Sequence, residues 1–150
     1  MRSIHLNTCC LGNKNDTALM NISDFSDSSS LLNATPLEFE EFGIKKIAEV
    51  SVEVRKLSDL IETQGLPVPD LIKLDVQGFE LEVLKGAGEF LDLATYLIIE
   101  VSFREYYYGQ PLFLEITNYL ANHGFSIHAF GVSTAMGKEL GQMDILFKKK

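Results

Sequence analysis

The sequence predicts an α/β domain whose single mixed sheet is mostly parallel and ends in an antiparallel pair of strands. From residue 71 onward, apolar segments of strand length alternate with segments of helical periodicity, which is typical of parallel βαβ units. The last two predicted strands have no helix between them, so we expect them to run antiparallel. The chain has 150 residues, which suits one domain with a single core over 1–150.

The N-terminal third is predicted to hold short elements. Residues 4–11 resemble a strand, and the Gly, Asn and Asp residues of 12–16 predict a turn. Residues 17–22 can then pair back as a second short strand. A polar loop over 23–33 follows, and 36–46 is expected to be irregular or a short helix, with Gly43 as its break.

A strand and a helix are predicted next. Residues 49–55 alternate valine with polar residues, which predicts a half-buried, edge-like strand with Val50, Val52 and Val54 on one face. Ser58 is expected to cap a short helix over 59–64 that Gly65 ends.

The C-terminal half carries the strongest signals. A buried strand over 71–76 precedes a helix with apolar residues from Phe79 to Leu91, which Gly86 and Gly88 interrupt near its end. The remaining predicted elements are a strand over 96–101, an amphipathic helix over 112–123, and strands over 125–130 and 143–148 joined by a glycine-rich loop over 131–142.

Composition excludes several classes of function. The net charge of −8 argues against nucleic acid as a partner, because phosphate binding needs an excess of Lys and Arg. No apolar run approaches the roughly 20 residues of a membrane span, and no secretory signal opens the chain, so we expect a cytoplasmic protein. Cys9 and Cys10 are adjacent and are expected to be reduced thiols, with no metal-ligating cluster around them.

The candidate site lies where two predicted strands end. Asp75 and Glu100 each follow apolar strand residues. If these strands are neighbours, both carboxylates lie at one rim of the sheet, where open α/β sheets bind ligands. The alternatives are structural: Asp75 pairs with Lys73 or caps the next helix, and Glu100 accepts backbone N–H bonds.

Other polar residues near this rim have open roles. Gly78 lets the backbone approach a ligand or simply makes a turn. Glu80 and Glu82 lie in a first helical turn, where the helix dipole favours acids, and this explains Glu82 better than Glu80. The segment 106–109, Tyr-Tyr-Tyr-Gly, lines an acceptor pocket or is a packed aromatic loop. The three histidines are expected to be structural.

Several motifs together resemble one family. The most specific is Lys-Leu-Asp-Val-Gln-Gly-Phe-Glu at 73–80. It is followed by Val-Leu-Lys-Gly-Ala at 83–87, Ile-Ile-Glu-Val at 98–101, Gly-Phe-Ser-Ile at 124–127 and Asp-Ile-Leu-Phe at 144–147. Segments 28–32 and 48–60 also fit. In this order the motifs resemble the FkbM-type methyltransferases.

The resemblance implies a Rossmann-like methyltransferase fold that uses S-adenosylmethionine. It also implies a small-molecule or saccharide acceptor whose hydroxyl group is methylated, on a sugar or a polyketide-type natural product. Asp75, Gln77 and Gly78 would then lie at the cofactor. Asp75 is the first candidate for the general base that takes the hydroxyl proton, and Glu100 is the second.

The sequence departs from the family in two ways. Gln77 stands where the family usually has Glu. We also expect the family's N-terminal cofactor-binding strands to be missing from these 150 residues, because no Gly-rich loop precedes the strand predicted over 4–11, which resembles the family's third strand. We therefore expect an N-terminally truncated fold, weak or absent S-adenosylmethionine binding by the isolated 150 residues, and an exposed sheet edge through which a homo-oligomer could form.

Two other functions compete with the enzyme. One is a non-catalytic remnant or interaction module of the methyltransferase fold. The other is a receiver-type signalling domain, because 69–76 also resembles the phospho-acceptor strand of receiver domains. The receiver needs an acidic pair after its first strand and a Lys after its fifth, and neither is evident.

Overall fold

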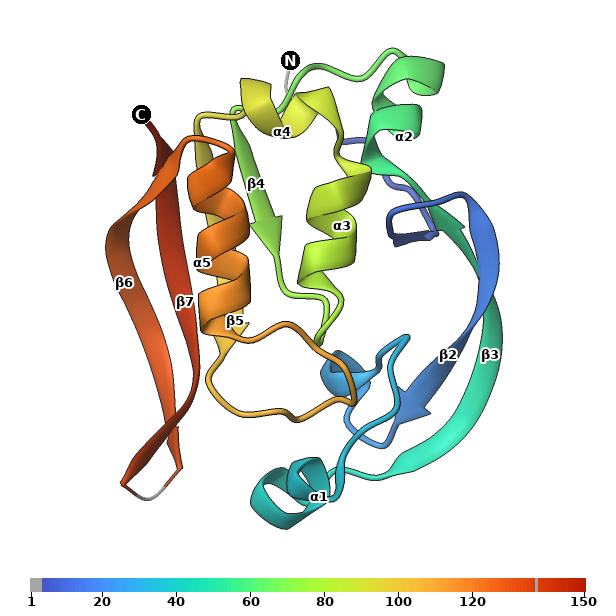
Figure 1. Cartoon of the computed structure of the whole chain (residues 1–150). Helices are drawn as coiled ribbons and strands as arrows, with labels where there is room; N and C mark the ends of the chain where they lie inside the picture. The colour runs from blue at the N-terminus through green and yellow to red at the C-terminus, as the bar shows by residue number, and fades with distance from the viewer. Residues whose placement is uncertain (1–3, 137) are drawn as a thin grey trace.

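The computed structural model describes residues 4–136 and 138–150 and contains two mixed β-sheets (Figure 1). The larger sheet has the strand order β4 (Leu71–Leu74), β5 (Tyr96–Ser102), β7 (Glu139–Lys149), β6 (Phe125–Met136). The smaller has the order β1 (Cys10–Leu11), β3 (Lys46–Arg55), β2 (Asp16–Ser23). The α/β class is confirmed, and two sheets stand where one was predicted.

Most strand pairs are antiparallel, so the prediction of a mostly parallel sheet is wrong. In the described residues only β4–β5 and β1–β3 are parallel, whereas β2–β3, β5–β7 and β6–β7 are antiparallel. In the larger sheet the reason is local: β6 and β7 are joined by a turn too short for a crossover helix, so β7 runs antiparallel to β6, and it lies antiparallel to β5 on its other side. The predicted C-terminal antiparallel pair is confirmed as β6–β7.

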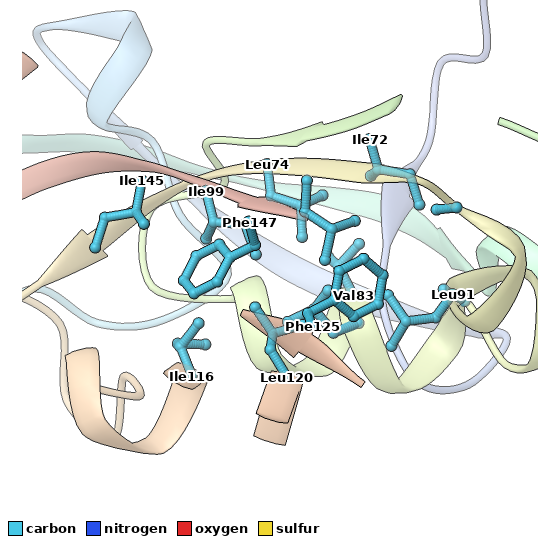
Figure 2. Close-up of a cluster of buried hydrophobic side chains, with 14 of the residues drawn as sticks. Ile72, Leu74, Val83, Leu91, Ile99, Ile116, Leu120, Phe125, Ile145 and Phe147 are labelled. Atoms are coloured by element: carbon cyan, nitrogen blue, oxygen red, sulfur yellow. The ribbon is translucent and has the colours of Figure 1, made fainter. Parts of the chain in front are cut away.

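The main core lies between the larger sheet and two helices, α3 (Glu80–Gly86) and α5 (Phe113–Asn122). Figure 2 shows Val83 of α3 and Ile116 and Leu120 of α5 on the same side of the sheet as Ile99 and Phe147. Alternate residues of β4 and β5 are buried against these helices, and the residues between them are half-buried or exposed. The sheet therefore has one well-covered face and one more open face.

Three shorter helices complete the fold: α1 (Pro36–Phe42), α2 (Leu57–Gln64) and α4 (Glu89–Leu93). Gly43 and Gly65 end α1 and α2 in left-handed conformations, as predicted. The predicted Ser58 cap is wrong, because α2 begins at Leu57. The helix predicted from Phe79 to Leu91 is split into α3 and α4 at Gly88, whose φ is +57°.

Several predicted strand limits are also wrong. The strand predicted over 4–11 is only Cys10–Leu11, because the described residues offer no surface that covers its apolar residues Ile4 and Leu6, which are 94% and 86% exposed. β4 ends at Leu74, two residues earlier than predicted. β3 begins at Lys46 and is the central strand of its sheet, since both β1 and β2 pair with it.

The glycine-rich segment 131–142 is largely strand, not loop. β6 continues to Met136 and β7 begins at Glu139; residue 137 lies outside the described residues. Gly141 occurs in the strand because a Cβ there would lie 2.5 Å from the Tyr106 hydroxyl. Among the described residues β4 pairs only with β5, so the predicted open sheet edge is present at β4.

Candidate functional site

The turn after β4 has an unusual backbone. Gln77 has φ of +50° and Gly78 has φ of +92°. Left-handed conformations are uncommon for residues other than glycine and concentrate at functional sites. The buried Glu80 carboxylate holds the turn: its Oε1 accepts hydrogen bonds from the backbone N–H groups of Val76 (3.1 Å) and Gly78 (3.2 Å). Glu80 therefore has a structural role that explains its burial.

Gly78 serves packing at this turn. A Cβ on Gly78 would lie 3.0 Å from Cβ of Gln110 and 3.3 Å from Cβ of Tyr107. The glycine thus lets the segment after β5 pack closely on the turn. Gly78 is buried and lines neither of the two hollows described below.

Asp75 and Glu100 lie on adjacent strands. The parallel register pairs Leu74 with Ile99, so the residues that follow each, Asp75 and Glu100, come side by side at the end of the strands. Asp144 of β7 is the cross-strand partner of Glu100. Three carboxylates therefore stand in a row on the more open face of the sheet, as predicted for the first two.

The two predicted carboxylates have different partners. Asp75 accepts hydrogen bonds from Lys73 Nζ (3.1 Å, Oδ2) and Gln77 Nε2 (2.8 Å, Oδ1). The pairing of Asp75 with Lys73 is thus confirmed. Glu100 Oε2 accepts one hydrogen bond, from Gln142 Nε2 (3.3 Å). No backbone N–H of the described residues reaches it, so that alternative is wrong.

Two hollows adjoin this rim. The first, which we call the apolar hollow, has a volume of about 430 Å³. It is lined by Cys9, Cys10, Leu11, Met20, Ser26, Asp27, Ser29, Ser30, Leu31, Asp75, Val76, Gln77 and Phe79. The second, the acidic hollow, has a volume of about 270 Å³. It is lined by Phe25, Asp27, Ser28, Glu38, Phe42, Ile44, Asp75, Gln77, Glu100 and Gln142.

The two hollows share part of their walls. Asp27, Asp75 and Gln77 line both. Molecules bound in the two hollows would therefore meet at the turn after β4. This arrangement suits a reaction in which a group passes from one bound molecule to another.

The acidic hollow carries strong negative potential. Four carboxylates line it, from Asp27, Glu38, Asp75 and Glu100, and no Lys, Arg or His side chain does. Burial together with the charges of Asp75 and Asp144 raises the pKa of Glu100 to about 7. Burial also raises the pKa of Glu38. Glu100 is consequently poised to exchange a proton near neutral pH.

The aromatic segment after β5 forms a packed loop. Tyr106 and Tyr107 are buried and line neither hollow, while Tyr108 is exposed. Gln110 Oε1 accepts hydrogen bonds from the backbone N–H groups of Tyr106 and Tyr107. The packed-loop interpretation is thus correct for Tyr106, but the hydroxyl of Tyr107 reaches Glu38 (3.2 Å) and Gln77 (3.3 Å) at the acidic hollow.

The cysteines and histidines add no further reactive group. Both thiols are free, and burial raises the pKa of each. None of the three histidines lines either hollow. Within residues 4–136 and 138–150, no three His, Cys, Asp or Glu side chains gather in a geometry that could hold a metal ion. No helix of this part of the chain is both long and apolar enough to cross a membrane.

Sequence reasoning missed Asp27 and Glu38, which come from the 3₁₀-helix Ser26–Ser28 and from α1. Segment 23–46 was predicted to be a polar loop followed by an irregular or short helical stretch. No sequence pattern marked Glu38, because its burial becomes visible only in the structure: on α1 the acid Glu38 is 4% exposed, whereas its apolar neighbour Phe39 is 52% exposed. A buried acid beside an exposed phenylalanine reverses ordinary helix burial.

Comparison with known proteins gives a consistent result. A family model described as a methyltransferase FkbM domain matches residues 2–127. The chain is 34% identical over 79 residues to hexuronic acid methyltransferase AglP of Haloferax volcanii, covering 51% of this chain and 33% of AglP. It is 43% identical over 61 residues to 2-O-methyltransferase NoeI of Sinorhizobium fredii, covering 41% and 25%.

A third relative is methyltransferase sdnD of Sordaria araneosa, 45% identical over 58 residues, covering 33% of this chain and 22% of sdnD. The chain thus spans a third or less of the length of each of these relatives. No solved structure matches the chain.

Proposed function

The chain belongs to the methyltransferase FkbM domain family, and from that premise we propose that it takes part in S-adenosylmethionine-dependent methylation of a hydroxyl group on a sugar or natural-product acceptor. The observation that carries the proposal is the pair of hollows that share Asp75 and Gln77, with Glu100 in the wall of one. The names of AglP and NoeI, a hexuronic acid methyltransferase and a 2-O-methyltransferase, support this class of acceptor.

The residues of the apolar hollow suit the methionine end of the cofactor. S-adenosylmethionine supplies an electrophilic methyl group on a sulfonium centre. Val76, Phe79 and Met20 offer apolar contacts for the methionine chain, and Asp27 and Asp75 offer carboxylates for its ammonium group. For the adenosine end, no Gly-rich strand–loop–helix occurs among residues 4–136 and 138–150. Weak cofactor binding by the isolated chain therefore stays a prediction.

We assign the proton transfer to Glu100. Its pKa of about 7 leaves a large share of the carboxylate ionised at neutral pH, which suits a general base. Only Oε2 accepts a hydrogen bond within the described residues, so Oε1 is left for the acceptor hydroxyl. Asp75 has donors on both oxygens and is better placed to orient a bound molecule than to take a proton. This reverses the ranking expected from the sequence.

The larger sheet supports a Rossmann-like architecture in this proposal. Its order β4–β5–β7–β6, with β7 antiparallel, would be one side of such a sheet. The outer edge of β4 would then pair with a further strand or with a second copy of the chain, which is how a homo-oligomer would arise.

Methyl transfer from labelled S-adenosylmethionine at millimolar concentration tests the proposal, with a panel of methyl glycosides as acceptors. The high cofactor concentration compensates for weak binding. We expect transfer by the wild type and a loss of about a hundredfold in Glu100→Gln, since general-base catalysis contributes at least that much. Glu40→Gln is the matched control, because Glu40 is an exposed acid of α1 outside both hollows. No transfer by the wild type to any glycoside would contradict the proposal.

A further inference from the structure

Around the Tyr107 hydroxyl, beside the acidic hollow, hydrogen-bond acceptors outnumber donors. The hydroxyl of Tyr107 lies 2.9 Å from the carbonyl oxygen of Ser28, 3.2 Å from Glu38 Oε1 and 3.3 Å from Gln77 Oε1. All three are acceptors, and a hydroxyl group has a single proton to donate. That one proton cannot be donated to all three oxygens at once, so Tyr107 satisfies Glu38 and Gln77 only in part. The oxygens of Glu38 and Gln77 can therefore accept a further donor.

Of these acceptors, the buried carboxylate of Glu38 most needs further hydrogen-bond donors and positive charge. Its side chain is 4% exposed, and it lines the acidic hollow from α1. No donor in the described part of the chain reaches its Oε2. The carboxylate of Glu41, which is paired with Arg104, disfavours ionisation of Glu38 further. A buried carboxylate that is neither paired nor fully hydrogen-bonded is costly, so a ligand that brings donors and positive charge would be stabilised there.

The rest of the hollow fits the same kind of ligand. Asp27, Asp75 and Glu100 add three more carboxylates; Lys73 pairs with Asp75, and no basic side chain lines the hollow itself. Phe25 and Phe42 offer aromatic surface to the apolar face of a sugar ring or to a cation. An anionic ligand would face repulsion from all four carboxylates in a partly desolvated site.

We propose that Glu38 is a specificity-determining residue, and that it makes the acidic hollow select a polyhydroxylated acceptor with a protonated amine and reject one with a carboxylate. This inference rests on the proposed function, because it names the class of acceptor for that site. It also separates this chain from AglP, whose name specifies a hexuronic acid. An ammonium group has three N–H donors, enough to serve both Glu38 oxygens and Gln77.

Three glycosides that differ only at carbon 6 provide the test: methyl 6-amino-6-deoxyglucoside, methyl glucoside and methyl glucuronoside. Their binding to the 150-residue chain is measured by calorimetry or ligand-detected NMR without cofactor, at about pH 8, above the pKa of Glu100. We expect the amino sugar to bind at least about tenfold tighter than the glucoside, and the glucuronoside weakest of the three.

Variants identify the residue responsible. Glu38→Gln keeps the size of the side chain and should reduce the preference for the amino sugar over the glucoside about tenfold. Glu40→Gln, an exposed acid on the same helix, should leave it unchanged. If circular dichroism shows that Glu38→Gln does not fold, Asp27→Asn replaces it, because Asp27 is exposed and lines the same hollow. A smaller change in the same direction is expected.

Equal binding of the three glycosides, tighter binding of the glucuronoside, no binding of any of them, or an unchanged preference in folded Glu38→Gln would each overturn the inference. Its failure differs from failure of the proposed function. Methyl transfer to the glucuronoside would keep the function and overturn the inference. A Glu38-dependent preference for the amino sugar without any methyl transfer would keep the inference about binding and overturn the proposed function.

Discussion

Replacing Glu100 with glutamine should stabilise the fold at alkaline pH and leave its stability unchanged at acid pH. In the folded chain, burial and the neighbouring Asp75 and Asp144 raise the pKa of Glu100 from its usual value near 4.5 to about 7. The folded state therefore binds the proton more tightly than the unfolded state. The stability that comes from this proton is fully present below pH 4.5 and is lost as the pH rises through about 7.

The size of the effect follows from the difference between the two pKa values. A rise from 4.5 to about 7 corresponds to about 3 kcal/mol of free energy of unfolding. Solvent screens a half-buried side chain at the rim of a hollow, which reduces the figure to about 2 kcal/mol. A neutral glutamine at position 100 avoids this loss and can still accept the hydrogen bond from Gln142.

Urea unfolding of the wild type and of Glu100→Gln at several pH values between about 4 and 8 measures the difference. We expect the variant to be about equal to the wild type near pH 4 and about 2 kcal/mol more stable near pH 8. Glu40→Gln, an exposed acid, should track the wild type throughout. A difference between Glu100→Gln and the wild type that is constant across the range would refute the reasoning, because a pH-independent effect does not involve the proton of Glu100.

Two further predictions concern the close packing of Gly86 and the hydrogen bonds of Tyr107. Gly86→Ala should lower the free energy of unfolding by about 3 kcal/mol, because a Cβ there would lie 1.8 Å from the carbonyl oxygen of Gly12. Urea unfolding measures this, and a variant more stable than the wild type would contradict the packing of α3 on the turn at Gly12. Tyr107→Phe should cost about 1–2 kcal/mol by leaving the Ser28 carbonyl without its donor. It should also raise the pKa of Glu38, whose hydrogen bond from Tyr107 favours ionisation; NMR titration of Glu38 in both proteins checks this, and an unchanged pKa would show that the contact is unimportant.

The parts of the fold that the sequence predicted well are those whose burial follows the chain's own periodicity. β5 and α5 each bury one face against the same core, so their apolar spacing identified them. The open edge at β4 and the pairing of β6 with β7 were also anticipated. These elements need little information from distant residues.

The errors arise where contacts with residues distant in the sequence determine the local secondary structure. Gly131 and Gly141 suggested a loop, yet both occur in strands because Asp144 and Tyr106 occupy the space beside them. The alternation of Ile4 with Leu6 suggested a strand, but both side chains are exposed in the described part of the chain. In each case the sequence pattern was real, and a contact, or the lack of one, overrode it.

The same division applies to the candidate site. Asp75 and Glu100 were predicted because strand ends meet at one rim of a sheet. Asp27 and Glu38 were not, because they belong to a segment with weak periodicity that reaches the rim only through tertiary packing. Local sequence patterns thus reveal least about Asp27 and Glu38, which line the acidic hollow together with Glu100.

The electrostatics of the rim connect the proposed base to the proposed acceptor. A neutral ligand that filled the acidic hollow would expel water, and this would favour protonation of Glu100 just when its carboxylate is needed. An ammonium group in the hollow has the opposite effect, since an opposite charge within a few ångströms favours the ionised form. Glu100 would then remain a carboxylate in the filled hollow only when a cationic acceptor is bound. The base and the selectivity would therefore depend on one another, and Glu38→Gln should change the pH dependence of methyl transfer as well as the choice of acceptor.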